Sequence, residues 1–150
     1  MTNTDPMEKK EIGAIGEGLT AKYLEQHGYT VLERNFHGPH GEIDVIAKND
    51  RYLVFCEVKT RKSFPSPGPY GRPARAVNVA KRKHLLDTAR YYMKKTFGTD
   101  APEGLQPRMD VSEILYEQNG EQTTYRIRYI TRAFGANGGG GQENGWEMEE

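Results

Sequence analysis

The sequence predicts an α/β domain in which a mixed β-sheet is flanked by helices, with elements in the order α-β-β-β-α-β-β. Three observations support this fold class. Two strand-like segments, 41–47 and 53–60, flank a polar turn and predict a hairpin. Segments with helical periodicity lie on both sides of that hairpin, at 11–27 and about 74–97. A second pair of strands is joined through Asn119-Gly120, a strong hairpin turn.

Composition limits the class of protein. With 150 residues the chain is long enough for one domain with a buried core. We assign that domain to residues 11–134, preceded by a flexible segment, 1–10, and followed by a disordered tail rich in Gly and Glu, 135–150. A single cysteine excludes a disulfide framework. No segment has the length of a membrane span and no secretory leader opens the chain, so we expect a cytoplasmic protein.

The first predicted helix, 11–27, combines an apolar stripe with three glycines. Each glycine inside a helix costs about 1 kcal/mol relative to alanine, so these glycines indicate that another part of the chain approaches closely. Glu17 lies on the side that faces away from the stripe, and taken alone it is an exposed surface residue. The stripe consists of Ile12, Ile15, Leu19 and Tyr23, and the glycines are Gly13, Gly16 and Gly18.

A strand at about 29–36 precedes the predicted hairpin. If the hairpin turn is centred on Asn49-Asp50, Asp44 and Glu57 are diagonal neighbours on one face, roughly 7–8 Å apart at the backbone. The opposite face of the hairpin is wholly apolar, which predicts that it faces a core. That face consists of Ile43, Val45, Ala47, Val54, Cys56 and Val58.

The polar face of the hairpin carries three carboxylates that repel one another, on Glu42, Asp44 and Glu57. A cation must stabilise them, and Lys59 projects from the same face. Carboxylate oxygens also suit Mg²⁺ or Mn²⁺, with waters completing the coordination shell. The alternative is a strand end whose charged residues lie in solvent, with Glu57 and Lys59 as an ordinary surface pair. The residues alone leave both interpretations open.

A net charge of zero hides an asymmetry along the chain. Residues 59–95 contain eleven Lys or Arg and one acidic residue, Asp87, whereas 135–150 contain four Glu and no Lys or Arg. A basic block that begins beside a carboxylate cluster favours contact with a polyanion whose phosphate approaches the cluster. The alternative is a solvated helix face, which is the usual role of a run of charges.

The remaining elements follow from local patterns. Residues 63–73 form a Pro- and Gly-rich loop, either a flap over the candidate site or a connector. Two strands are predicted near 109–116 and 123–131. Asp110 opens the first of them, either as a further acidic partner or as a turn residue. The second helix, about 74–97, has a buried stripe of Leu85, Leu86, Ala89, Tyr92 and Met93.

Several short sequence motifs along the chain together match the pattern of a known family. They are Gly16-Glu17, Gly28-Tyr29, Arg34-Asn35, Gly41-Glu42-Ile43-Asp44, Glu57-Val58-Lys59-Thr60-Arg61, Lys81-Arg82-Lys83 and Ile130-Thr131-Arg132-Ala133-Phe134. An Asp on one strand with Glu-x-Lys on the next resembles the PD-(D/E)xK nuclease superfamily, which includes archaeal Holliday-junction resolvases. Over about 11–134 the chain resembles more closely the YraN-like bacterial family of that superfamily. Ile43 replaces the Pro that names the superfamily, and that Pro is not a ligand.

The resemblance implies a restriction-endonuclease-like sheet and a metal-dependent endonuclease that acts on DNA, with branched DNA and a homodimer inherited from the resolvases. It implies that Asp44, Glu57 and the Val58 carbonyl bind Mg²⁺ or Mn²⁺, and that Glu17 adds a carboxylate to the metal site. Lys59 would orient the attacking water. The catalytic set is thus Asp44, Glu57, Lys59 and Glu17. The residues expected to contact nucleic acid are Arg34, Arg61, Lys62, Arg72, Lys81, Lys83 and Arg90.

Two other functions stay open at this point. One is a nucleic-acid-binding accessory protein that keeps the nuclease fold but has little or no turnover. The other is an interaction domain whose carboxylates are structural. Binding of Mn²⁺ separates this last function from the other two, because a structural ion pair does not need a metal.

Overall fold

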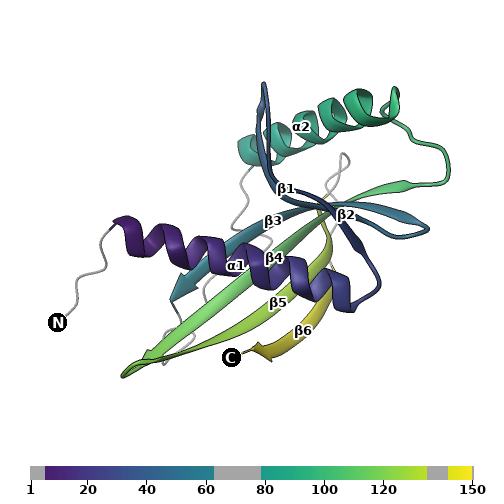
Figure 1. The fold of residues 1–150 in the computed structure, drawn as a ribbon. Coiled ribbons are helices and arrows are strands. Elements are labelled where there is room, and N and C mark those ends of the chain that lie inside the picture. Colours follow the sequence, from purple (N-terminus) through teal and green to yellow (C-terminus); the bar gives the residue numbers. More distant parts are fainter. Residues whose placement is uncertain (1–5, 63–78, 135–141, 150) are drawn as a thin grey trace.

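A computed structural model describes residues 6–62, 79–134 and 142–149, and Figure 1 shows their arrangement. These described residues form two helices and a sheet in the order α-β-β-β-α-β-β that the sequence predicts, with one further strand near the C-terminus. The elements are α1 (Pro6–Gln26), β1 (Thr30–Gly38), β2 (Gly41–Lys48), β3 (Tyr52–Lys62), α2 (Val79–Phe97), β4 (Gln106–Asn119), β5 (Gln122–Phe134) and β6 (Gln142–Glu149).

The element bounds differ from the predicted ones at the ends. Helix α1 begins at Pro6 rather than at residue 11, in the helix-initiating position that proline favours. Strands β4 and β5 are longer than predicted and meet at a tight turn, because Asn119 pairs with Gln122. The predicted loop 63–73 and the start proposed for the second helix, at about 74, lie outside the described residues.

The described strands form one mixed sheet in the order β1-β2-β3-β4-β5-β6. Strands β3 and β4 pair in parallel, and the other neighbouring strands pair antiparallel. A parallel pair needs a crossover connection, and α2 lies within the connection from β3 to β4. The mixed sheet with flanking helices confirms the expected fold class.

Residues 142–149 differ from the disordered tail predicted from their composition. Their backbone pairs antiparallel with β5 as β6. The composition argument considers only side chains, whereas the edge of β5 offers unpaired backbone N–H and C=O groups to any extended segment. The division into a segment 1–10, a domain 11–134 and a tail stays a prediction.

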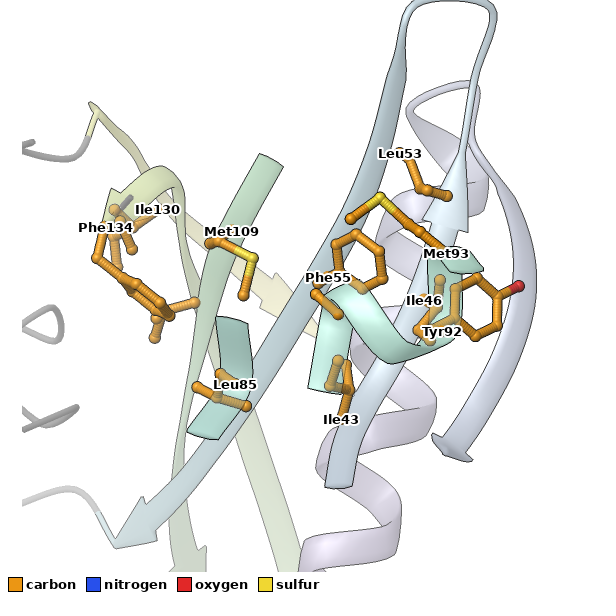
Figure 2. Packing of buried hydrophobic residues seen from close by; sticks show 13 residues of the cluster. Ile43, Ile46, Leu53, Phe55, Leu85, Tyr92, Met93, Met109, Ile130 and Phe134 are labelled. Carbon is orange, nitrogen blue, oxygen red and sulfur yellow. The ribbon is translucent and has the colours of Figure 1, made fainter. Parts of the chain in front are cut away.

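Both faces of the sheet are covered, each by one helix. Figure 2 shows α2 packed on one face, where Leu85, Tyr92 and Met93 contact side chains of β2 and β3 such as Phe55. The buried stripe predicted for the second helix is therefore confirmed at Leu85, Ala89, Tyr92 and Met93. Leu86 is partly buried and packs against this cluster. Ile43 also lies in the α2 cluster, so its expected place on the opposite face is wrong.

Helix α1 covers the other face and crosses in front of β3 and β4 in Figure 1. The second cluster contains Val45, Ala47, Val54 and Cys56 from the predicted apolar face of the hairpin, together with Tyr23 and Leu24 of α1. The buried line of α1 runs through Gly16, Thr20, Tyr23 and Leu24. Ile15 of the predicted stripe is 43% exposed instead.

Gly16 explains why the buried residues of α1 differ from the predicted apolar stripe. A Cβ at Gly16 would collide with the Thr60 hydroxyl on β3 and would touch Ile114 on β4. Thr20, one turn further on, shares a hydrogen bond of 2.8 Å with Ser112 on β4. The helix therefore rests directly on the sheet at its small and polar residues, where long apolar side chains would hold it away. Of the helices that the structure describes, neither is apolar enough along its length to cross a membrane.

Candidate active site

The turn between β2 and β3 sets the alignment of the candidate site. Asn49 accepts hydrogen bonds from the backbone N–H groups of Arg51 and Tyr52 through its side-chain oxygen, at 2.9 and 2.7 Å. This side-chain turn centres the hairpin between Asp50 and Arg51, so Val45 pairs with Cys56. The expected centre on Asn49-Asp50 is therefore wrong. Continued by one residue, the observed register puts Asp44 directly opposite Glu57 instead of diagonal to it.

The backbone pairing of β2 and β3 ends immediately before this pair. Val45 and Cys56 are the last partners in the ladder. Two residues beyond Cys56, the Val58 N–H donates a hydrogen bond of 2.7 Å to Oδ2 of Asp44, the residue before Val45. The Asp44 carboxylate thus replaces the strand partner that the Val58 amide would otherwise lack. This contact holds the aspartate of β2 against the Glu-x-Lys segment of β3.

Glu57 lies at the centre of the site and is only 5% exposed. Two lysines contact the same oxygen, Glu57 Oε2: Lys81 of α2 at 2.9 Å and Lys59 of β3 at 3.5 Å. The hydrogen bond to Glu57 raises the pKa of Lys81 above its ordinary value of 10.5. Sequence reasoning placed Lys81 among phosphate contacts, but its spacing from Glu57 gives no sign that a helix brings it back to the site.

Burial raises the pKa of Asp44 from 3.8 to about 8, and the neighbouring negative charge of Glu57 adds to the rise. The hydrogen bond from Val58 N–H acts in the opposite direction. Two carboxylates that meet in a largely buried place must share a proton or bind a cation, because both ionised forms repel one another. Their closeness is therefore the observation that fits a bound metal.

Side chains supply only some of the ligands that a hard divalent ion would need at this site. Within the described ranges no three His, Cys, Asp or Glu side chains lie close enough together to hold an ion on their own. Asp44 and Glu57 would supply two carboxylates, and the Val58 carbonyl and waters would complete the shell. That combination fits Mg²⁺, which keeps several waters and often takes one or two protein carboxylates.

The other two acidic candidates lie further out. Glu17 of α1 raises the pKa of Asp44 through its charge, but it is the smallest of the contributions. A role of Glu17 at the metal stays a prediction. Glu42 is turned to an exposed ion pair with His37, in which His37 Nδ1 and Glu42 Oε2 are 3.2 Å apart.

The basic residues predicted to contact nucleic acid are distributed over both faces of the sheet. Lys83 and Arg90 lie on α2, each at 3.4 to 3.5 Å from Asp87, and both remain more than half exposed. Arg61 contacts the buried Glu113 of β4 at 3.2 Å. Arg34 lies on the α1 side, beside Gly18. Lys62 is the exposed last residue of β3 and Arg72 lies outside the described residues.

Asp110 has a role that neither prediction for it covered. It is fully buried within β4, and Arg108 holds it through hydrogen bonds of 3.0 and 2.9 Å to its two oxygens. Tyr129 O–H and Arg132 N–H also donate to it, at 2.7 and 3.0 Å. Arg-x-Asp on one strand is the sequence signal for this pair, because residues two apart share a face. Asp110 is therefore a structural carboxylate, not a strand-start turn residue.

The fold and the site define a class: an α/β protein of restriction-endonuclease-like arrangement with an Asp and a Glu-x-Lys where two strands separate. Residues 16–114 match the model of the family described as "Uncharacterised protein family UPF0102", and the chain belongs to this family. This confirms the YraN-like family inferred from the motifs.

Curated relatives agree with this membership over nearly their whole length. A UPF0102 protein of Caldicellulosiruptor bescii is 38% identical over 128 residues, which cover 85% of this chain and all of the relative. A UPF0102 protein of Clostridium botulinum is 39% identical over 83% of this chain and 94% of its own. One from Dictyoglomus thermophilum is 34% identical over 85% of this chain and all of its own.

Proposed function

We propose that this protein is a metal-dependent endonuclease that hydrolyses phosphodiester bonds in DNA. The observation that carries the proposal is the meeting of Asp44 and Glu57 at the end of the β2–β3 ladder, with two lysines on the same glutamate. Buried paired carboxylates next to ammonium groups are expensive as structure alone, because desolvation offsets most of the attraction. A phosphate-cleaving site uses both signs of charge.

Asp44, Glu57 and the Val58 carbonyl would hold Mg²⁺ or Mn²⁺. When bound, the ion would polarise the phosphate and lower the pKa of the attacking water. The Val58 N–H fixes Asp44 in place and so positions the oxygen that faces the site. Glu17 would orient an outer water from α1.

We assign to Lys59 the task of activating the nucleophile, which is the attacking water. Its ammonium lies 3.5 Å from Glu57 Oε2 and its side chain is 30% exposed, so it reaches from the glutamate towards the open side of the site. A lysine in this position can orient or help deprotonate the attacking water, and it can stabilise negative charge on the phosphate.

The substrate would be held mainly through its backbone. Lys83 and Arg90 form an exposed basic surface on α2, on the helix whose first turn reaches Glu57. Such contacts fix the position of a nucleic acid without reading its sequence. Branched DNA as the preferred substrate and a homodimer as the active form are parts of this proposal that come from the resolvase resemblance.

The proposal is tested by cleavage of labelled single-stranded, duplex, flap and four-way-junction DNA in Mg²⁺ and in Mn²⁺. We expect metal-dependent cutting that Asp44→Ala, Glu57→Ala and Lys59→Ala abolish. Glu42→Gln is the matched control, because it changes an exposed carboxylate two residues from Asp44. Binding of DNA should survive in the Asp44→Ala and Lys59→Ala variants.

Three results would contradict the proposal. Cutting that persists in Glu57→Ala would place the chemistry elsewhere. Salt-sensitive binding without cutting of any of these DNAs would leave a nucleic-acid-binding accessory protein, and absence of both Mn²⁺ binding and DNA binding would leave an interaction domain with structural carboxylates.

A further inference from the structure

The active site joins two separate parts of the fold. Lys59 belongs to β3, the strand that also carries Glu57, whereas Lys81 belongs to the first turn of α2. Lys81 nevertheless makes the shorter contact with Glu57 Oε2, at 2.9 Å against 3.5 Å for Lys59. The motif Glu-x-Lys therefore accounts for only one of the two ammonium groups on the glutamate.

When both carboxylates at this place are ionised, their charges balance those of the two lysines without an ion. Asp44 and Glu57 supply two carboxylates when ionised, and Lys59 and Lys81 supply two positive charges. A divalent cation added to this group brings an excess of two positive charges. It would bind Glu57, the same carboxylate that both ammonium groups contact, so it would lie close to two like charges. Binding of an ion is therefore opposed by the lysines unless negative charge arrives with it.

The phosphates of a nucleic acid can supply that negative charge. The Lys81 side chain is 45% exposed, and it stands on a flexible stem of four carbons that can turn from Glu57 to a substrate oxygen. The same helix continues as an exposed basic surface through Lys83, whose side chain is 75% exposed. A polyanion that follows α2 would thus reach Lys81 before it reaches the buried carboxylates.

We infer that Lys81 is a positioning residue that couples metal binding to substrate binding. Its ammonium neutralises Glu57 when no ion is bound and contacts a substrate phosphate when an ion takes its place. Such coupling is reciprocal: DNA raises the affinity for the metal by the same factor by which the metal raises the affinity for DNA. This inference rests on the proposed nuclease function.

The test measures metal affinity instead of activity. Free Mn²⁺ is counted by electron paramagnetic resonance during titration of the full chain, alone and with saturating phosphorothioate DNA, which resists hydrolysis. Lys81→Met removes the charge and keeps the aliphatic stem. Lys22→Met is the control, because it removes an equal charge from an exposed lysine of α1 that lies outside the basic block of residues 59–95.

For the unaltered protein and for Lys22→Met we expect DNA to raise Mn²⁺ affinity about tenfold, within the usual range of coupling between sites. Lys81→Met should bind Mn²⁺ more tightly than the unaltered protein without DNA, and its gain from DNA should fall to about twofold or less. Equal gains in Lys81→Met and Lys22→Met would overturn the inference and leave the nuclease proposal intact. No Mn²⁺ binding by any of the proteins would overturn both.

Discussion

At the scale of single residues, Asp44 combines two tasks that usually belong to different groups. Its carboxylate accepts the Val58 N–H in place of a strand partner, and it meets Glu57 in a largely buried position. The first task favours the ionised form and the second disfavours it. Burial and the charge of Glu57 prevail, since the pKa of Asp44 rises to about 8.

This raised pKa makes the stability of the metal-free protein depend on pH. The folded state keeps the Asp44 proton up to about pH 8, whereas the unfolded chain loses it near pH 3.8. Between these values the folded state binds more protons, so its free energy of unfolding falls as pH rises. Relative to Asp44→Asn, which does not titrate, the unaltered protein should lose stability across that window in urea unfolding with a chelator present. If the unfolding free energy of the unaltered protein minus that of Asp44→Asn stays constant or grows as pH rises, the raised pKa of Asp44 is contradicted.

Asp110 shows a different use of a buried carboxylate. It is fully buried with Arg108, Tyr129 and the Arg132 amide around it. Asp110→Asn leaves the buried Arg108 charge without its partner, which typically costs about 3–5 kcal/mol of unfolding free energy. Asp87→Asn is the matched control at an exposed pair, where the expected loss is about 0–1 kcal/mol. Equal losses in thermal or urea unfolding would contradict the structural role of Asp110.

At the scale of elements, the contact of α1 with the sheet depends on Gly16. Gly16→Ala puts a methyl group into the Thr60 hydroxyl on β3, so α1 must move or Thr60 must change its rotamer. We expect a loss of about 1–3 kcal/mol in unfolding free energy.

Gly13→Ala supplies the control for this prediction. Among the residues that the structure describes, no atom beyond the chain neighbours and the helix's own backbone lies within 4 Å of a Cβ at Gly13, so the same substitution gains helix propensity without a clash. It should stabilise the protein by up to about 1 kcal/mol. Destabilisation by both substitutions would show that α1 is sensitive to any change, and not to the close approach at Gly16.

The elements also show how far sequence patterns lead. Period and turn residues predict the order of helices and strands and the stripe of α2, because these follow from local propensity. They misplace the β2–β3 register by two residues, so that Asp44 is expected opposite Phe55 instead of Glu57, since Asn49 moves the centre of the turn through its side chain. They miss Lys81 at Glu57 because that contact depends on how α2 docks on the sheet.

At the scale of the whole molecule, charge is separated along the chain. The basic block of residues 59–95 includes the end of β3 from Lys59 onward and all of α2 except its last two residues. A nucleic acid bound there would release counterions from its phosphates. The motif residues of the candidate site follow from the sequence, whereas the role of Glu113 does not, because its partner Arg61 lies on β3. For Asp110 the spacing signals only Arg108, since Tyr129 and Arg132 come from β5.

Salt dependence tests this arrangement. DNA affinity should fall steeply with salt, and Lys83→Gln with Arg90→Gln should weaken binding to all sequences alike. Each lost phosphate contact reduces the slope of log affinity against log salt by about 1. Lys22→Gln on α1, an exposed lysine outside the block, is the control and should leave the slope unchanged. An unchanged slope in the α2 variants would place the nucleic acid on another surface.

The most direct test of the metal site is calorimetric titration of the chain with Mn²⁺. We expect Mn²⁺ binding that is lost in Glu57→Gln, because that substitution removes the charge of the central carboxylate while keeping its shape. Glu42→Gln, the exposed carboxylate paired with His37, should bind as the unaltered protein does. Mn²⁺ binding that survives in Glu57→Gln, or that never occurs in the unaltered protein, would contradict a metal centre built on Asp44 and Glu57.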